Sequence, residues 1–335
     1  MLSRNFLIRF AYSTVLIGSL CVTLMIVSLL KSKIYIFQDS QEINEVAQEI
    51  EPFPVSVNLY TEVIDDNPAV NEFFAETLAN DSGSRDNWWN QVAAVFATKG
   101  WYQNLASPVS RIVVIWPGER KEEATKKISE ILRWDEEDKM EFQSLINQSS
   151  PVMLEGKYFP GQYVTHRNAT PSDVTQLILE SFEKEVLARY TPEVEQNVPL
   201  TQALIIASLL EREASDFNNM REVAGVIWNR LFIDMPLQLD ATLQYARGSR
   251  TYERSWWPKV VPNDKYIDSP FNTYQNSGLP PAPIANPSAE AILAALNPIK
   301  TDCLYYFHAS KGRYYCSPTY EEHVSKLRSL YGRGS

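Results

Sequence analysis

The stretch RIVVIWPGERKEEATKKISEIL, Arg111–Leu132, predicts a strand, a turn and a helix in immediate succession. Arg111–Trp116 is rich in β-branched residues, which favour strands, and the Pro117-Gly118 dipeptide is typical of a turn. Lys121–Leu132 then places its apolar residues at helical spacing. A second helix is expected over about Glu136–Ile146, so this part of the chain predicts a small α/β module.

On either side of this module, short extended segments and amphipathic helices alternate with turn-rich chain, and no repeat of fixed period is present. The expected fold class is therefore α+β. An extended segment is expected over Leu154–Val164 and a polar linker over Tyr190–Val198. The other predicted helices are Pro171–Arg189 with Thr170 as its N-cap, Leu200 to about Ser215, Met220–Phe232, Ser288–Leu296 and a last one from about Thr319.

The N-terminal region has the pattern of a membrane anchor. Phe10–Leu30 contains no charged residue, and at about 1.5 Å per helical residue it can cross a hydrocarbon core of roughly 30 Å. The run is longer than the apolar part of a signal peptide, so an uncleaved transmembrane helix is expected. Arg4, Arg9 and the amino terminus slightly outweigh Lys31 and Lys33, which places the rest of the chain outside the cytoplasm at the inner (plasma) membrane. A short strand, Ile34–Phe37, and a helix should follow.

Composition limits the chemistry of the exported part. The net charge of -10 argues against nucleic acid as a partner, because phosphate binding needs a basic surface. The 3 histidines are dispersed, and there is neither a Cys/His cluster with zinc spacing nor a glycine-rich phosphate loop. No metal or other cofactor is therefore expected, and carboxylates, hydroxyls and amides are the candidate functional groups.

Two cysteines flank a predicted hairpin near the C-terminus. Its strands are expected within Cys303–His308 and Arg313–Cys316, with the turn at Ser310–Gly312. A turn centred there does not place Cys303 directly opposite Cys316. A disulfide would suit an oxidising compartment, but two unpaired, buried thiols are the favoured alternative.

A candidate catalytic carboxylate lies in IIASLLEREAS, Ile205–Ser215. At about 100° per helical residue, Glu211 shares a face with small residues such as Ser208, which should leave space for a ligand beside it. Glu213 points about 200° away from Glu211, so the two acids should not enter one cleft unless the helix ends between them. The pattern alone favours a solvated or ion-paired side chain, with Arg221 or Arg230 as the candidate partner.

Further motifs downstream favour a catalytic role for the helix that carries Glu211. In order, the chain carries Ser208, Glu211 and Glu213 as Ser-x-x-Glu-x-Glu, Asn229-Arg230-Leu231, Leu237-Gln238-Leu239-Asp240, Asn272-Thr273-Tyr274, Gly278-Leu279-Pro280-Pro281 and Glu322-His323. Each piece is common alone, but their order and spacing closely resemble the catalytic domain of the MltG/YceG-like endolytic murein (lytic) transglycosylases.

The resemblance extends more weakly upstream. Leu154–Tyr163 is similar to a bridging segment of the family, and Arg111–Ile146 resembles its LysM-like subdomain. Two residues depart from the family pattern: Ala241 stands where Pro is usual, and Phe271 where Tyr is usual. The Ala241 change leaves the shape of the Asp240 loop open.

The resemblance implies lytic cleavage of the β-1,4 bond between N-acetylmuramic acid and N-acetylglucosamine within a peptidoglycan strand. Glu211 matches the catalytic acid, which would protonate the leaving oxygen and then accept the proton of the muramic C6 hydroxyl, closing a 1,6-anhydro ring. Gln238, Asp240, Asn272 and Tyr274 are the expected substrate-binding residues. For Gln238 and Asn272, turn-building is an equal alternative.

Such an acid must stay protonated near neutral pH, which requires burial or a nearby negative charge. Asp240 is the better source of that charge, because helical spacing separates Glu213 from Glu211. Glu213 and Arg230 are therefore expected to support the structure. The substrate supplies its own nucleophile, so no second catalytic carboxylate is needed, unlike the paired-acid glycosidases.

The apolar N-terminal run and the resemblance together predict the order of domains. A cytoplasmic tail and transmembrane helix should occupy residues 1–33, an extracytoplasmic region without an assigned role 34–108, the LysM-like module 109–150, a bridging segment and helix 151–198, and the catalytic domain 199–335. A non-catalytic peptidoglycan-binding or scaffold protein remains an alternative. Binding to cell-wall synthesis proteins is compatible with the enzyme.

Overall fold

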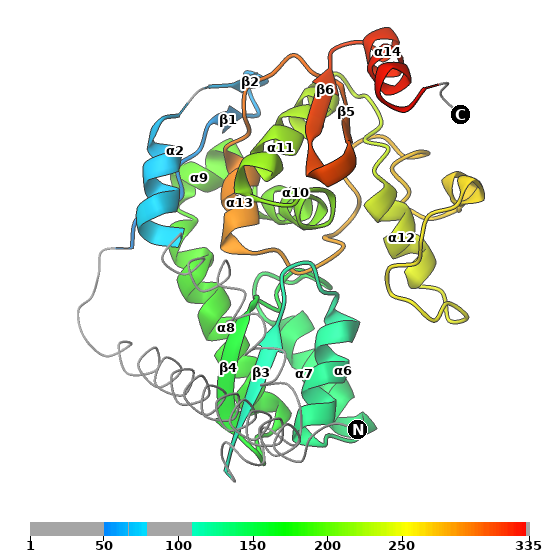
Figure 1. Cartoon of the computed structure of the whole chain (residues 1–335). Helices are drawn as coiled ribbons and strands as arrows, with labels where there is room; N and C mark the ends of the chain where they lie inside the picture. The colour runs from blue at the N-terminus through cyan, green and yellow to red at the C-terminus, as the bar shows by residue number, and fades with distance from the viewer. Residues whose placement is uncertain (1–49, 66, 79–108, 333–335) are drawn as a thin grey trace, which may run out of the picture. The chain divides into compact units, whose positions relative to one another are not determined.

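The computed structural model describes residues 50–65, 67–78 and 109–332, all within one of the two units into which the chain divides (Figure 1). The predicted membrane anchor, Phe10–Leu30, and the strand and helix expected after it lie outside these residues. Within the described part, no helix combines the length and apolar composition needed to cross a membrane. The described part is mixed α+β, as predicted, with helices and antiparallel two-stranded sheets.

The first predicted strand begins a module of its own (Figure 1). β3 (Ser110–Ile115) is followed by α6 (Lys121–Leu132) and α7 (Glu136–Gln148), close to the predicted bounds. β4 (Gly161–His166) then pairs antiparallel with β3, and α8 (Pro171–Glu185) packs against α7 and β4. Strand pairing thus carries the module past residue 150, where the sequence analysis ends it.

A hydrophobic core holds these elements together. One face of the strand pair meets the apolar faces of the helices, because strand side chains alternate and helical ones recur every three to four residues. Val174 and Ile178 of α8 join this core, so part of the predicted bridging segment belongs to the module. Its buried members are Val113, Ile115, Ala124, Ile128, Leu132, Trp134, Phe142, Ile146, Tyr158, Tyr163, Ala169, Val174 and Ile178.

A larger core forms where α10 (Leu200–Glu213) packs against α11 (Phe217–Phe232) and α13 (Ala289–Leu296). Trp228 of α11 is 1% exposed. Its indole N–H donates to the carbonyl oxygen of Ala295 over 2.8 Å, which satisfies the polar atom of a buried aromatic side chain. This core supports the candidate site, because α10 carries both glutamates of the Ser-x-x-Glu-x-Glu motif.

The described part of the N-terminal region adds to the larger core. β1 (Val57–Asn58) pairs with β2 (Val63–Ile64), and α2 (Ala69–Phe73) continues into the π-helical turn η2 (Phe74–Leu78). Sequence analysis assigns no role to this segment. Its buried side chains are Phe53, Val57, Ile64, Val70, Phe73 and Leu78.

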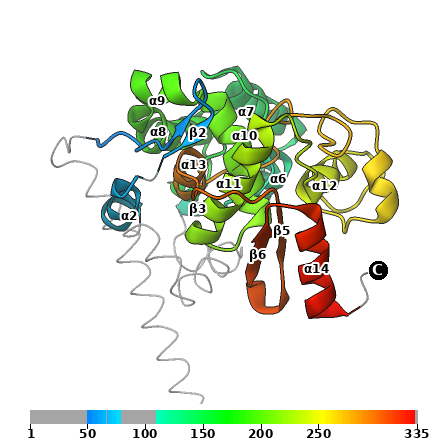
Figure 2. The ribbon, with the colours of Figure 1, turned by 90° about the horizontal axis from the view of Figure 1, so that it is seen from above.

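The predicted hairpin is confirmed near the C-terminus. β5 (Tyr305–His308) pairs with β6 (Tyr314–Ser317) around the short turn η5 (Ser310–Gly312). α14 (Tyr320–Tyr331) packs against both strands, as Figure 2 shows from above, and Thr319 caps it as predicted.

Cys303 and Cys316 are joined by a disulfide, so the expectation of two unpaired thiols is wrong. Cys316 lies in β6 opposite Tyr306, whereas Cys303 precedes β5. The offset noted in the sequence does not prevent the bond. The coil before β5 brings the two Cα atoms to 5.7 Å, within the range that disulfides span.

Several short elements differ from the sequence predictions. α9 (Pro192–Asn197) occupies the expected polar linker, and α12 (Asp240–Gly248) replaces the expected Asp240 loop. α8 ends before Arg189, and the 3-10 turn η3 (Leu187–Arg189) follows it. Another 3-10 turn, η4 (Pro262–Tyr266), lies in turn-rich chain. These elements are too short to show a clear apolar period, which is why the pattern misses them.

Candidate active site

α10 ends at Glu213, two residues before the predicted end, and this sets the direction of the Glu213 side chain. Ala214 is extended, with φ -121° and ψ 158°. Leu209 and Leu210 of the last turn are buried in the core, whereas Glu213 is partly exposed. Because the helix ends here, the Glu213 carboxylate can contact residues from other parts of the chain.

Two donors hold the Glu213 carboxylate. The backbone N–H of Ala241 donates to Oε1 over 3.3 Å, and the hydroxyl of Tyr306 donates to Oε2 over 3.0 Å. Burial raises the pKa of Glu213; the charge of Asp240 also raises it, while the two donors and Arg212 lower it. The net shift is upward, so Glu213 holds its proton to a higher pH than an exposed glutamate does.

A second carboxylate belongs to the same cluster. Asp240 is the first residue of α12, and its Oδ1 accepts a hydrogen bond from the hydroxyl of Tyr274 over 2.7 Å. Burial raises the pKa of Tyr274, and the hydrogen bond to Asp240 and the charges of Asp240 and Glu213 raise it further. Its phenol therefore stays a neutral donor. We call Glu213, Asp240, Tyr274 and Tyr306 the acid cluster.

Gln238 lies just before α12 in an unusual backbone conformation. Its φ of 51° lies in the left-handed region, which residues other than glycine rarely adopt and which is enriched at functional sites. The Gln238 N–H donates to the carbonyl oxygen of Thr273 over 3.0 Å, which fixes the turn. The side chain is exposed and makes no hydrogen bond to any described residue. This arrangement leaves the amide available for a ligand.

Asn272 makes the hydrogen bonds of a turn-building residue. It is 0% exposed. Its Nδ2 donates to the carbonyl oxygens of Lys265 and Ile267, and its Oδ1 accepts from the N–H of Tyr274. Both polar atoms of the amide are thus used within the loop, and Asn272 serves to place Tyr274.

Arg230 lies where a supporting residue is expected. It is 7% exposed. Its Nε donates to the carbonyl oxygen of Leu304 over 2.6 Å, and its Nη1 donates to those of Leu237 over 2.6 Å and Pro236 over 3.3 Å. The guanidinium therefore joins the coil before β5 to the turn before α12, two segments that lead into the acid cluster.

Glu211, the expected catalytic acid, is hydrogen-bonded to the start of α13. Its Oε1 accepts from the N–H of Ser288 over 2.8 Å and from the Ser288 hydroxyl over 2.5 Å, at the N-cap of α13. The expected space for a ligand beside it is filled. Ser208 is 0% exposed and its hydroxyl oxygen accepts from the N–H of Ile284, and Gly118 lies against the Glu211 Cβ. The small residues of this face accommodate the chain that leads into α13.

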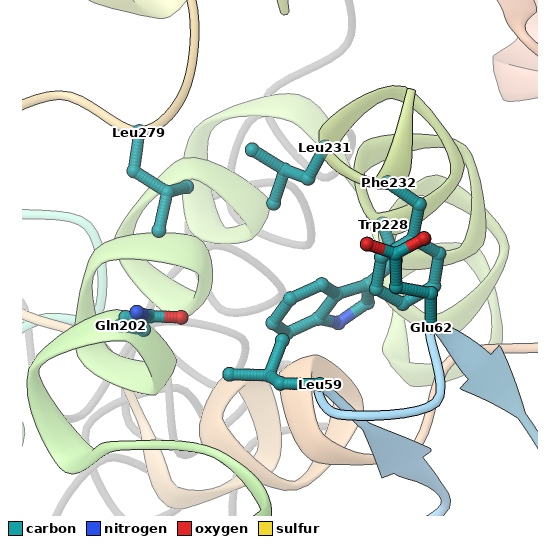
Figure 3. Close-up of a pocket in the computed structure, with 7 residues that line it drawn as sticks. All are labelled: Leu59, Glu62, Gln202, Trp228, Leu231, Phe232 and Leu279. Atoms are coloured by element: carbon teal, nitrogen blue, oxygen red, sulfur yellow. The ribbon is translucent and has the colours of Figure 1, made fainter. Parts of the chain in front are cut away.

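A separate cavity of about 330 Å³ lies between α11, the β1–β2 turn and the start of α10 (Figure 3). Most of its lining residues are apolar, with Glu62 and Gln202 as the polar ones. No member of the acid cluster lines it, so it is separate from the candidate site. Its lining residues are Leu59, Glu62, Gln202, Trp228, Leu231, Phe232 and Leu279.

Tyr306 and Ala241 are not among the site residues expected from the sequence. Strand alternation could have found Tyr306, because it shares a face of β5 with His308, which contacts Asn219 of α11. Ala241 was visible only as a departure from the family pattern, and its significance is that alanine has an N–H where proline has none.

Within residues 50–65, 67–78 and 109–332, no group of three or more His, Cys, Asp and Glu side chains is arranged to hold a metal ion. What the acid cluster offers is proton transfer by a carboxyl group of raised pKa, with a second carboxylate and neutral phenols beside it. Together with the α+β fold, this defines a candidate acid–base site of the kind that glycan-cleaving enzymes use.

The chain belongs to the YceG-like family, whose model matches residues 89–329, and this confirms the resemblance seen in the sequence. An endolytic murein transglycosylase of Bacillus subtilis (strain 168) is 36% identical over 189 residues, which are 56% of this chain and 50% of that relative. One of Streptococcus pneumoniae serotype 2 is 34% identical over 171 residues, 51% of this chain and 31% of the relative. The chain thus matches half or less of the length of these curated relatives.

A solved structure also resembles the chain. The crystal structure of a YceG-like protein from Listeria monocytogenes aligns with a TM-score of 0.56 and 29% sequence identity, covering 64% of this chain and 75% of that one. The similarity therefore reaches beyond the local motifs to the arrangement of much of the chain.

Proposed function

We propose that this protein is an endolytic lytic transglycosylase of peptidoglycan and that Glu213 is its catalytic acid. The observation that carries the proposal is the Glu213 carboxyl at the end of α10, whose pKa is raised and which lies with Asp240 and Tyr274 in one cluster. The relatives in B. subtilis and S. pneumoniae, named endolytic murein transglycosylases, supply the substrate class.

Glu213 replaces Glu211 in this proposal for a geometric reason. The Glu211 carboxylate accepts two hydrogen bonds from Ser288 at the start of α13. Glu213 is the glutamate that adjoins Asp240, and it is the last residue of α10, where its side chain is partly exposed.

The reaction needs one carboxyl group in two states. Protonated Glu213 gives its proton to the glycosidic oxygen as the bond from that oxygen to C1 of N-acetylmuramic acid breaks. The resulting carboxylate takes the proton of the C6 hydroxyl of the same sugar, whose oxygen bonds to C1 and closes the 1,6-anhydro ring. Glu213 is again protonated, and no water is consumed. Its raised pKa suits the first step, because the proton must be present near neutral pH.

The neighbours of Glu213 suit the other demands of this reaction. The charge of Asp240 helps Glu213 to keep its proton, and it can stabilise the positive charge that develops at C1. The exposed amide of Gln238, held out by a left-handed backbone, can bind a sugar hydroxyl or acetamide group. Tyr274 orients Asp240 through its hydroxyl.

The remainder of the chain fits a role at the cell envelope. The strand–helix–helix–strand order of β3, α6, α7 and β4 supports a LysM-like module that holds glycan. The uncharged segment Phe10–Leu30 supports an anchor in the plasma membrane, with the catalytic domain outside the cytoplasm where peptidoglycan lies. Proteins of cell-wall synthesis are the expected neighbours of an enzyme in that position.

Digestion of purified sacculi by the full-length chain in heavy-oxygen water tests the reaction. We expect fragments that end in 1,6-anhydro-N-acetylmuramic acid and carry no heavy oxygen, together with internal cuts that shorten the strands. Reducing ends that carry heavy oxygen would show a hydrolase. Binding to sacculi without released fragments would show the non-catalytic binding or scaffold protein instead.

A further inference from the structure

We infer that Tyr306 is a positioning residue for Glu213 and that the backbone N–H of Ala241 is its companion on the other carboxylate oxygen. The inference rests on the proposed function of Glu213. The Tyr306 hydroxyl lies 3.0 Å from Oε2 and the Ala241 nitrogen 3.3 Å from Oε1, so the two donors grip opposite sides of the carboxylate. They come from β5 and α12, two elements that are distant from α10 in the sequence.

The backbone of β5 is held in place near Tyr306. Cys316 lies directly opposite Tyr306 in β6 and is bonded to Cys303, just before β5. Arg230 donates to the carbonyl oxygen of Leu304, two residues before Tyr306. The disulfide and the Arg230 hydrogen bond thus hold the backbone just before Tyr306, and pairing with β6 holds Tyr306 itself, so its hydroxyl keeps its place beside Glu213.

The phenol acts on the ionised form of the acid. Burial raises the pKa of Tyr306 well above its usual range, and the charge of Glu213 raises it further, so Tyr306 stays neutral. A neutral phenol donates more strongly to a carboxylate than to a protonated carboxyl group, and it therefore favours the ionised state. That state forms after Glu213 has given up its proton and before it takes the C6 hydroxyl proton.

The second donor is the backbone N–H of Ala241. Proline at this position would offer no N–H. The same carboxylate with proline at this position would lose one of its two donors. The N–H of Ala241 therefore contributes to lowering the pKa of Glu213, against the larger effect of burial.

Several charged or titratable groups face Glu213 besides Tyr306. Asp240 comes from α12, Tyr274 from the loop after η4, and Arg212 from α10 itself. The Arg230 guanidinium acts on Tyr306 from α11. Replacing the phenol by phenylalanine leaves all these groups in place, so any change in the pH dependence reports the lost hydroxyl.

The pH profile of anhydro-product release by the full-length chain tests the inference. Activity needs protonated Glu213 and falls as the pH rises through its pKa. Tyr306→Phe should raise that pKa and move the alkaline limb upward by about one pH unit, with kcat about tenfold lower and KM unchanged. Ala241→Pro should move the limb in the same direction. Tyr314→Phe is the matched control, because Tyr314 stacks on Tyr306 but donates to the carbonyl oxygen of Glu222. Its profile should equal that of the wild type.

Two different failures can be told apart. If Tyr306→Phe and Ala241→Pro keep the wild-type limb while their thermal unfolding shows them folded, the positioning role is wrong and the proposed function stands. If one variant does not fold, the other still decides. If the wild-type chain releases no anhydro-ended product, the proposed function is wrong and this inference falls with it.

Discussion

Replacement of Arg230 by methionine should destabilise the protein strongly, because one side chain satisfies three backbone carbonyl oxygens. Arg230 is 7% exposed, so water cannot readily take its place. The bonds to Leu304 and Leu237 are both 2.6 Å long, and that to Pro236 is 3.3 Å. A buried acceptor left without its donor costs about 1–3 kcal/mol, and counting the two short bonds gives a loss of about 4 kcal/mol.

Thermal unfolding of the full-length chain, followed by circular dichroism, measures this loss. For a unit of this size, about 4 kcal/mol corresponds to a fall in Tm of roughly 10 °C. The Tm of Arg230→Lys should lie between those of Arg230→Met and the wild type, because one ammonium group cannot span carbonyls on both segments. Arg328→Met, at an exposed position of α14, is the control and should change stability by less than about 0.5 kcal/mol. A Tm for Arg230→Met within a degree or so of the control would refute the supporting role.

Three other predictions concern stability and ligand binding. Burial raises the pKa of Glu155 well above its usual value, so the fold loses stability as the pH rises from the unfolded pKa toward the folded one. Glu155→Gln should therefore raise Tm above pH 7 and lose that advantage near pH 5; an equal gain at both pH values would contradict this. The paired serine variant of Cys303 and Cys316, separated by 13 residues, should lose about 3 kcal/mol in denaturant titrations, and an unchanged midpoint would oppose it. Gln238→Gly should raise Tm by relieving the left-handed backbone, yet raise KM for glycan strands; a lower kcat with unchanged KM would argue against ligand contact.

Local patterns in the sequence predict elements whose ends are set by neighbouring residues. α6 begins and ends at the predicted residues, and Arg133 ends it with a left-handed φ of 61°. Thr170 caps α8 as predicted, because its hydroxyl oxygen accepts from the N–H of Asp173. The β5–β6 hairpin follows from its turn residues. All these features depend on contacts between residues that are close in the chain.

Features that depend on distant contacts could not be predicted in the same way. β4 pairs with β3 across two helices, and the Cys303–Cys316 bond depends on a bend in the coil before β5. The proposed change of catalytic acid from Glu211 to Glu213 has a related cause. A helical projection treats the helix as continuous, whereas α10 stops at Glu213 and Ala214 is extended. The face of small residues beside Glu211 is present as predicted, but the segments around Ile284 and Gly118 fill the space.

The central claim is that Glu213, and not Glu211, is the catalytic acid. The most direct measurement is the rate of anhydro-product release from sacculi by Glu213→Gln and Glu211→Gln, each corrected for the folded fraction by thermal unfolding. We expect Glu213→Gln to lose at least about a hundredfold in rate while remaining folded. Glu211→Gln keeps an acceptor for Ser288 and should retain most of its rate per folded molecule. Full loss in folded Glu211→Gln, with activity retained in Glu213→Gln, would contradict the account.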